Sequence, residues 1–308
     1  MSNSGFVLLD KIAGETSFKA LFPLKRVFST KRVGHAGTLD LRASGLIIAA
    51  TGRCTRLLPF IEAKDKCYSF RLHLGYETDT LEWDGEVVEQ DANVIASGAK
   101  QSITREDVER VLPQYTGDIE QIPPKYCAVK INGVRASDLM ERGRNIELKP
   151  RKIHISELKV LGEGGVTEGC SGKEFATFDL ICECSKGTYI RALGRDIGRA
   201  LGTYACVSQI RRHRIGNVTL DKAVRGDALT RENLLPVDAV LDFPVVRLTD
   251  EQVAVIRQGN WLPWKEKIEG VGPEGHVFAA NAQGEVLSLC FYEPGRIKPK
   301  FYLGEDDK

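Results

Sequence analysis

GHAGTLDLRASG, residues 34 to 45, is the stretch from which the rest of this sequence can be interpreted. It places one carboxylate, Asp40, among small residues between a basic segment, 31 to 33, and the apolar run LIIAA. Gly and Asp are residues that any turn uses to reach unusual backbone angles and to cap its own amides. An ordinary turn is therefore one interpretation and a functional acid is the other, and the remainder of the chain decides between them.

Composition limits the class of protein. With 308 residues, 42% hydrophobic and 28% charged, the chain can bury one sizeable core and has room for a second, smaller unit. No apolar run approaches the roughly 20 residues of a membrane span, and the start MSNSGFVLLDK lacks the features of a signal peptide. We expect a soluble cytoplasmic protein without a membrane segment.

The eight cysteines are scattered without CxxC pairs, so neither disulfides nor structural zinc is expected. Cys182 and Cys184 fall on one face of a predicted strand, where packing is their expected role. The net charge is only +1, so overall charge gives no argument for a nucleic-acid partner. Two local clusters could be either solvated faces or contacts with a polyanion: Lys25, Arg26, Lys31 and Arg32, and then Arg211, Arg212, His213 and Arg214.

Periodicity and capping signals predict a series of short elements. They are a half-buried strand over 68–74, a capped helix beginning after Thr104, a tight turn at Asn132-Gly133, a helix over 136–143 and a strand over 175–184. The glycine-rich segment 162–174 lacks the spacing of a phosphate-binding loop, so we expect a mobile surface loop there.

A helix is predicted from TYIRALGRDIGRALG, residues 188 to 202, because its apolar residues recur at helical spacing. Arg191, Arg195 and Arg199 step by four residues and must share one stripe of that helix. A solvated stripe is one interpretation. The place of Arg191 in the first turn, where the helix dipole disfavours a cation, indicates instead a partner carboxylate or phosphate.

The pattern changes after Pro244. A short capped helix ending at Gly259 is followed by three short strand candidates, HVFAA, VLSLCFY and PKFYL. One helix with several short strands in about 60 residues indicates a compact β-barrel-like appendix. We therefore predict two domains, 1–245 and 246–308.

The chemical motifs are few. HExxH, GxSxG and cysteine clusters are absent from the sequence and the five histidines are dispersed, so a metal or serine hydrolase finds no support. A lone acid in a glycine loop, basic clusters and an aromatic residue at a strand start suit a carboxylate acting on a bound polyanion. Spacing alone does not establish that activity.

Several segments in the same order closely resemble the TruB family of tRNA pseudouridine synthases. They run from about Phe6 to Pro244: LLDKIAGETSF, VGHAGTLDLRASGLIIAATGRCTRLL, KCYSFRLHLG, IPPKYCAVKINGVRASDLMERG, CSKGTYIRALGRDIG, VSQIRRHRIG and LLPVDAVLDFP. The resemblance implies an α+β fold: a catalytic domain with a mixed, mainly antiparallel sheet of pseudouridine synthase type, and a small PUA-type RNA-binding domain at the C-terminus. It also implies formation of pseudouridine 55 in the TΨC loop, on the T-arm stem-loop of tRNA, by a monomer that needs no cofactor, metal or guide RNA.

The resemblance also assigns roles to individual residues. Asp40 matches the catalytic aspartate that takes part in cleaving the C1′–N1 bond of uridine, by a covalent-adduct or a glycal route. Tyr68 matches the tyrosine that stacks on the target uracil, and Arg191 the arginine that pairs with the catalytic acid. His35 matches a histidine that fills the gap left by flipped bases, and Ile210 an aliphatic wall of the pocket. Lys11 is a further substrate-binding candidate, either behind the pocket or at a phosphate.

Three positions depart from the family pattern: Ile12 and Leu41 replace prolines, and Ala36 replaces a threonine. The acid, the histidine and the flanking glycines remain, so we expect activity with some loss of loop rigidity. Two other functions stay open, a non-catalytic RNA-binding or RNA-folding protein and a guide-dependent synthase of the dyskerin type. A glycosidase would lack its second carboxylate.

Overall fold

The computed structural model describes residues 3–91, 103–168 and 174–304. The chain forms two compact units. Unit 1 comprises residues 1–40, 46–62 and 217–308, and unit 2 comprises residues 41–45 and 63–216. The loop 34–45 is therefore divided after Asp40, the last residue of its unit 1 segment.

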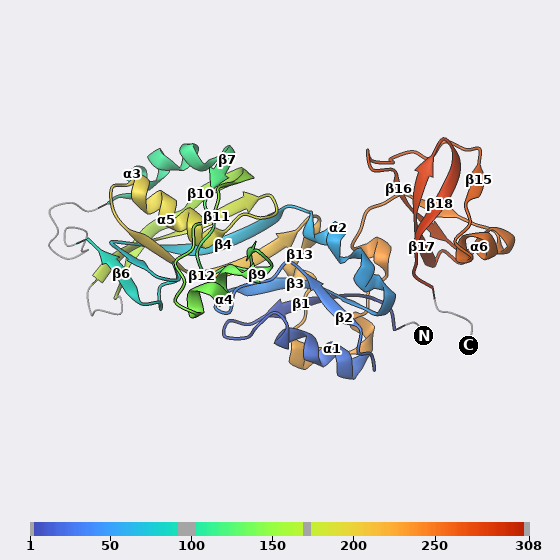
Figure 1. The fold of residues 1–308 in the computed structure, drawn as a ribbon, viewed down its shortest axis with the longest axis horizontal. Coiled ribbons are helices and arrows are strands. Elements are labelled where there is room, and N and C mark those ends of the chain that lie inside the picture. The colour runs from blue at the N-terminus through green and yellow to red at the C-terminus, as the bar shows by residue number, and fades with distance from the viewer. Residues whose placement is uncertain (1–2, 92–102, 169–173, 305–308) are drawn as a thin grey trace. The chain divides into compact units, whose positions relative to one another are not determined.

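Unit 1 begins with three neighbouring strands and several short helices (Figure 1). Its first elements are β1 (Gly5–Lys11), the 3₁₀ helix η1 (Lys19–Leu21), α1 (Phe22–Val27), β2 (Val33–Ala36), β3 (Ser44–Thr51), η2 (Gly52–Leu57) and α2 (Leu58–Glu62). β3 lies between β1 and β2, and β2 runs antiparallel to it. β1 and β3 are almost wholly buried, which explains why both read as continuous apolar runs in the sequence.

The segment after residue 217 returns along β1. It contains β13 (Val218–Thr219) and the 3₁₀ helices η4 (Leu220–Lys222), η5 (Gly226–Ala228), η6 (Arg231–Asn233) and η7 (Val237–Ala239). Phe6 and Leu235 exchange two backbone hydrogen bonds of 2.9 and 2.8 Å. The amide of Asp10 donates to the carbonyl of Val224 at 2.9 Å. These bonds satisfy the outer edge of β1, which would otherwise be an open strand edge.

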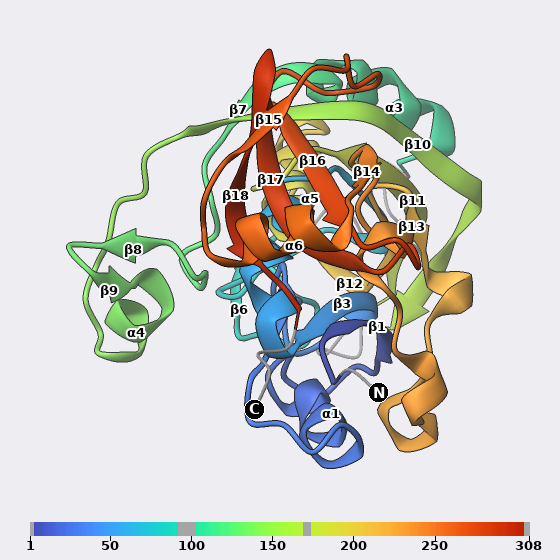
Figure 2. The same cartoon turned by 90° about the vertical axis from the view of Figure 1, so that its right-hand side faces the viewer.

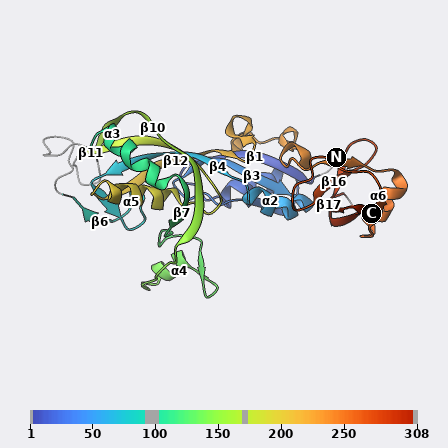
Figure 3. The same cartoon turned by 90° about the horizontal axis from the view of Figure 1, so that it is seen from above.

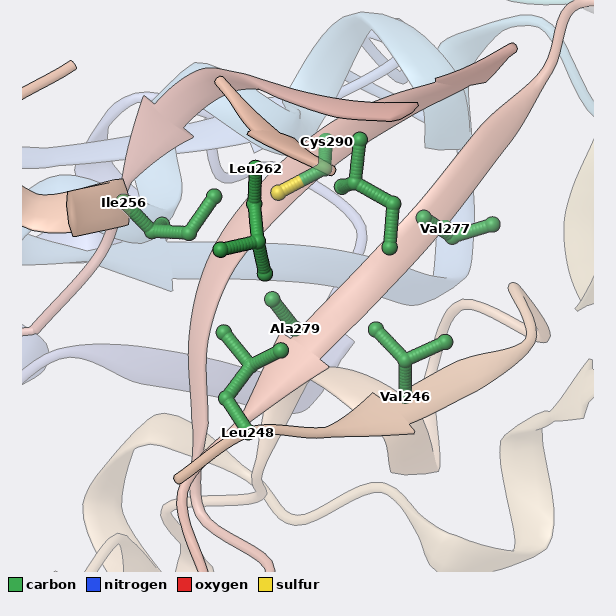
Figure 4. Close-up of a cluster of buried hydrophobic side chains, with 8 residues drawn as sticks. Val246, Leu248, Ile256, Leu262, Val277, Ala279 and Cys290 are labelled. Atoms are coloured by element: carbon green, nitrogen blue, oxygen red, sulfur yellow. The ribbon is translucent and has the colours of Figure 1, made fainter. Parts of the chain in front are cut away.

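The C-terminal part of unit 1 is a five-stranded sheet with one helix. Its elements are β14 (Val245–Arg247), α6 (Asp250–Arg257), β15 (Leu262–Trp264), β16 (His276–Ala280), β17 (Val286–Glu293) and β18 (Gly295–Tyr302), in sheet order β14-β16-β17-β18-β15. Figure 4 shows the apolar core enclosed by α6 and the strands, including Ile256, Leu262 and Cys290. The helix with several short strands is as predicted; β14 and β15 had no sequence signal.

Side chains of η2 and α2 contact this C-terminal sheet within unit 1. The guanidinium of Arg53 donates to the carbonyl of Gly304 at 2.8 Å. Arg56 lies over the ring of Phe301 at 5.7 Å from its centroid, and Lys300 lies over Phe60 at 5.0 Å. Because such contacts join the two parts of unit 1, the domain boundary at residue 245 stays a prediction.

Unit 2 is built on an antiparallel sheet in the order β12-β4-β11-β10-β7. Its elements are β4 (Lys66–Leu74), β5 (Tyr76–Thr78), β6 (Val87–Gln90), α3 (Arg105–Val111), η3 (Leu112–Tyr115), β7 (Gly117–Gln121), β8 (Lys130–Ile131), β9 (Val134–Arg135), α4 (Ala136–Glu141), β10 (Arg151–Glu168), β11 (Glu174–Cys184), α5 (Ile190–Ala200) and β12 (Ala205–Ile215). With parallel pairs at β14–β16 and β3–β12, the sheets are mixed and mainly antiparallel. The predicted α+β class is confirmed.

Local signals within unit 2 are confirmed. Thr104 and Asp107 form the capping box of α3. Asn132 and Gly133 both have positive φ and close the β8–β9 hairpin, as a tight turn between paired strands requires. Figures 2 and 3 both show that this hairpin and α4 stand away from the main sheet of the unit.

The prediction of a surface loop over residues 162–174 is wrong for the first part of that segment. Residues 162–168 continue β10, a strand of 18 residues that pairs with β11 as far as Glu168 and Glu174 (Figure 3). Gly162 and Gly164 have positive φ at a shift in strand register between Leu161 and Gly165. The glycines therefore accommodate a bulge in a hairpin. The rest of the segment, 169–173, lies outside the described residues.

The described cysteines are buried and free of disulfides. Cys182 and Cys184 are both buried, at 0% and 1% exposure, which confirms their packing role. Of the helices in the described ranges, none combines the length and the apolar character needed to span a bilayer.

Candidate active site

The loop that carries Asp40 is fixed through its backbone. Gly37, directly after β2, has a φ of 70°. The buried hydroxyl of Ser17 accepts a hydrogen bond of 2.9 Å from the amide of Leu39 and donates one of 3.0 Å to its carbonyl. Both polar groups of the residue before Asp40 are thus held by one side chain. Asp40 itself is only partly buried.

The exit of the loop, in unit 2, is fixed by a close approach to β12. Ser44 and Gly45 pair in parallel with Arg211 and Arg212. Gly45 has a φ of 101°, and a Cβ atom there would lie 2.3 Å from the carbonyl oxygen of Arg212. Only glycine fits this position, because a side chain would overlap the neighbouring backbone.

Tyr68 lies on β4 in register with Arg212 on β12. The side chain of Arg212 is only 1% exposed, and its Nη1 donates to the phenol oxygen of Tyr68 at 3.5 Å. A buried guanidinium that donates to a phenol oxygen helps to orient the ring. The sequence analysis did not single out Arg212 within its basic cluster. No local signal separates Arg212 from its basic neighbours, because its burial depends on the pairing of β12 with β4.

Ile210 lies at an irregular point of β12. The register with β4 shifts between Ser208 and Arg211, and Gln209 has a φ of 52°. Ile210 is 5% exposed, so an aliphatic side chain is accommodated without a polar atom to satisfy. The bulge gives this part of β12 a side-chain direction that regular alternation would not produce.

The basic cluster 211–214 is not a solvated face. Arg211 donates to the hydroxyl of Ser44 at 3.3 Å. The Nε2 atom of His213 is hydrogen-bonded to the hydroxyl of Ser69 at 2.7 Å. Arg214 forms a salt bridge of 2.7 Å with Glu183. Partial burial, together with the charge of Arg211, lowers the pKa of His213, so its neutral form is favoured. The cluster is therefore held by interactions within unit 2.

The arginine stripe of α5 is confirmed as one face of the helix, but two of its three members are buried. Arg191 is 4% exposed and donates to the carbonyls of Thr80 and Tyr126 at 2.9 and 2.8 Å. Arg195 donates to the carbonyl of Ile122 at 2.9 Å. Arg199 remains half-exposed beside Glu77. The first two guanidinium groups are therefore positioned by backbone acceptors.

The remaining candidates, His35 and Lys11, lie in unit 1. His35 is opposite Ala49 in the β2–β3 pair and is partly buried. Lys11 is 1% exposed, and its ammonium donates to the carbonyl of Ile12 at 3.0 Å. It lines a cavity of about 180 Å³ with acidic neighbours that include Asp10 and Glu15. This burial favours a role behind the pocket over a phosphate contact.

The structure thus brings together Tyr68 and Arg212 and fixes Arg191 on the helix that packs against β12. It fixes the backbone that carries Asp40 in unit 1. The predicted pairing of Asp40 with Arg191 joins residues of different units, and it stays a prediction.

Known structures share this fold. A chain of the structure of an H/ACA RNP bound to a substrate RNA containing 2′-deoxyuridine matches with a TM-score of 0.69 and 18% identity, over 98% of this chain and 86% of that one. A chain of the archaeal box H/ACA sRNP Nop10-Cbf5 complex matches with a TM-score of 0.67 and 18% identity, over 97% and 86%. What this chain shares with both structures is the fold.

Sequence comparisons identify the family. The model of the TruB family pseudouridylate synthase (N terminal domain) matches residues 25–190. The tRNA pseudouridine synthase B of Caulobacter sp. (strain K31) is 36% identical over 96% of this chain and 94% of its own length. That of Mycobacterium sp. (strain KMS) has the same identity and coverage. The chain belongs to the TruB family and is a pseudouridine synthase, as the resemblance implied.

Proposed function

We propose that this enzyme isomerises uridine to pseudouridine at position 55 in the TΨC loop of tRNA. It acts on the T-arm stem-loop as a cytoplasmic monomer without a guide RNA. The observation that carries the proposal is the match to enzymes named tRNA pseudouridine synthase B, which extends over 96% of the chain. The likeness to the H/ACA structures supports the fold alone, because the identity is 18%.

The proposed reaction breaks the C1′–N1 bond, rotates the uracil and forms a C1′–C5 bond. The proton on C5 is then lost to solvent, and N1, freed from the ribose, takes up a proton from solvent. Substrate and product are isomers, so the atoms balance without a second substrate. The carboxylate of Asp40 either adds to C1′ or supports a glycal intermediate. The loop around Asp40 suits this task, because Ser17 holds the preceding residue while small residues leave room for a ribose.

The target uridine is stacked within the T loop and must be flipped out before an acid can reach it. In the proposal Tyr68 stacks on the flipped uracil and assists removal of the C5 proton, with Arg212 orienting the phenol. Arg191 orients Asp40, and His35 fills the gap that the flipped base leaves. Ile210 forms an aliphatic wall of the pocket, and Lys11 supports it from behind.

The test is incubation of the purified protein with an unmodified T-arm stem-loop carrying tritium at C5 of uridine. Neither cofactor nor guide RNA is added. We expect tritium release, with pseudouridine mapped to the single position that corresponds to 55. A stem-loop with cytidine at that position is the matched control and releases nothing.

The same experiment separates the two alternatives. Tight binding of the stem-loop without tritium release would identify a non-catalytic RNA-binding protein. Release that depends on an added guide RNA would identify a dyskerin-type enzyme. Pseudouridine at another position would leave the activity intact and refute the proposed substrate position.

A further inference from the structure

Two large aromatic side chains of unit 1 are exposed side by side. Phe18 is 59% exposed and Phe22 is 50% exposed. Their rings meet edge to face with centroids 5.6 Å apart. The ammonium of Lys25 lies 5.0 Å from the centroid of Phe18 and 5.2 Å from that of Phe22. We name Phe18, Phe22 and Lys25 the aromatic ledge.

The backbone of η1 and α1 holds the ledge in place. The opposite side of these two helices is anchored by Ala20, Leu21, Leu24 and Phe28, all 5% exposed or less. Pro23 at the start of α1 restricts the backbone beside Phe22. The exposed rings are therefore the outer face of an anchored element. Two adjacent exposed aromatic rings on such an element indicate a binding surface.

The segment that carries the ledge is basic. Residues 16–33 contain five basic side chains and no acidic one, namely Lys19, Lys25, Arg26, Lys31 and Arg32. An apolar surface of a protein partner could pack on the two rings without the neighbouring cations. RNA presents flat bases that can stack on the rings and phosphates that can contact the cations.

The ledge is tied to the loop that carries the acid. Ser17, whose hydroxyl holds both the amide and the carbonyl of Leu39, immediately precedes Phe18. Asp40 immediately follows Leu39. A nucleotide whose ribose lies at Asp40 therefore has neighbours within reach of the ledge.

We propose that the aromatic ledge stacks an unpaired base of the RNA substrate that neighbours the flipped uridine. The inference rests on the proposed function, which supplies the RNA. Stacking on Phe18 or Phe22 gives affinity with little base preference, because every base has a flat face. Lys25, placed over both rings, contributes a phosphate contact at the edge of the stack.

The experiment compares Phe18→Ala, Phe22→Ala and Phe18→Tyr in the full chain, with Val166→Ala as the control. Val166 is also an exposed apolar residue, 56% exposed, and lies on β10 of unit 2. We expect each alanine variant of the ledge to raise the Kd for the T-arm stem-loop about tenfold, equivalent to about 1.4 kcal/mol. Phe18→Tyr and Val166→Ala should stay within twofold of the wild type.

A second readout reports stacking directly. Each unpaired purine of the stem-loop is replaced in turn by 2-aminopurine, whose fluorescence falls when it stacks. We expect one position to be quenched by the wild type and by Phe18→Tyr, and not by Phe18→Ala. If both alanine variants keep wild-type affinity and quenching, the aromatic ledge does not stack a base. Tritium release by the wild type would still support the proposed function in that case. A changed sedimentation coefficient with unchanged RNA affinity would overturn base stacking by the ledge in favour of self-association.

Discussion

The loop that carries Asp40 and the arginine-bearing interior of unit 2 are positioned in opposite ways. Asp40 is partly exposed, and its location follows from hydrogen bonds to the backbone of Leu39. Arg191 and Arg212 are 4% and 1% exposed, and each side chain makes its own hydrogen bonds. A hydroxyl thus holds the backbone of the residue before the acid, while the two cations are held through their own side chains.

This difference predicts different effects of mutation. Asp40→Asn replaces a partly exposed carboxylate by an amide of the same size, so the free energy of unfolding should change little. Changing a buried guanidinium leaves carbonyl oxygens without donors, which destabilises the fold as well as the site. Activity and stability should therefore separate at Asp40 and change together at Arg191 and Arg212.

The largest expected effect is on catalysis. Asp40→Asn should lower the single-turnover rate by about ten-thousandfold, roughly 5 kcal/mol of barrier, because an amide cannot replace the carboxylate during bond cleavage. RNA affinity should stay within threefold, since it comes mainly from phosphate contacts. Tritium release and filter binding measure the two quantities.

The matched control is Asp118→Asn, since the side chain of Asp118 is 93% exposed and contacts only His154 among the ion pairs of the described residues. This variant should behave as the wild type. A rate for Asp40→Asn within tenfold of the wild type would remove Asp40 from the catalytic role.

The next effect is on stability, where the loop enters β3. Gly45→Ala should lower the free energy of unfolding by about 4 kcal/mol, because the new Cβ overlaps the carbonyl of Arg212 at a positive φ. Gly187→Ala is the control, since Gly187 has a φ of 85° with nothing within 4 Å of its Cβ position. It should lose only about 1 kcal/mol from backbone strain. Equal losses in urea unfolding would show that the close approach is unimportant.

A third effect tests the interior of unit 2 through pH. His73 is 3% exposed and bonds the hydroxyl of Ser208 at 2.7 Å. Burial, with a smaller contribution from Arg71, lowers the pKa of His73 to about 4 from its ordinary 6.5, partly opposed by Asp179. Between these values the unfolded chain binds the extra proton, so stability falls as the pH falls from 6.5 to 4, by about 3 kcal/mol.

His73→Gln keeps a hydrogen-bonding side chain and cannot titrate. Its free energy of unfolding should depend on pH less steeply than that of the wild type by about this amount between pH 7 and pH 4. The control is His154→Gln, because the side chain of His154 is 52% exposed. Wild-type pH dependence in His73→Gln would show that His73 is not the buried titrating group.

The elements were predictable where the cause is local. The capping box of α3 and the Asn132-Gly133 turn depend on residues a few positions apart, and both are as predicted. The glycine-rich part of β10 was not predicted as a strand. Its glycines accommodate a bulge against β11, which follows later in the chain. Glycine has the same local signal in a bulge and in a loop.

The sequence predicted which residues form the candidate site better than it predicted the contacts that these residues make. The stripe of α5 follows from helical spacing, but the burial of Arg195 depends on the carbonyl of Ile122, more than 70 residues away. Arg212 could not be distinguished from its basic neighbours in the sequence, because its burial depends on the pairing of β12 with β4. Such long-range pairings have no signal in a single sequence.

The smallest expected effect decides between two roles of Arg191. Its guanidinium donates through two different nitrogens to the carbonyls of Thr80 and Tyr126. Arg191→Lys keeps the charge and loses the planar fork, so the cation cannot serve both carbonyls and a carboxylate at once. We expect the single-turnover rate at saturating RNA to fall about thirtyfold, roughly 2 kcal/mol of barrier, while Kd changes less than threefold.

The control is Arg199→Lys on the same stripe of α5. Arg199 is half-exposed beside Glu77 at 3.3 Å, so a lysine can replace its surface ion pair with little loss. Both variants are measured for single-turnover rate and for Kd across a salt series. An arginine that orients Asp40 changes the rate and leaves the salt slope unchanged, because no phosphate contact is lost. If Arg191→Lys instead changes only Kd and the slope, Arg191 binds the RNA backbone and the carboxylate of Asp40 has another partner.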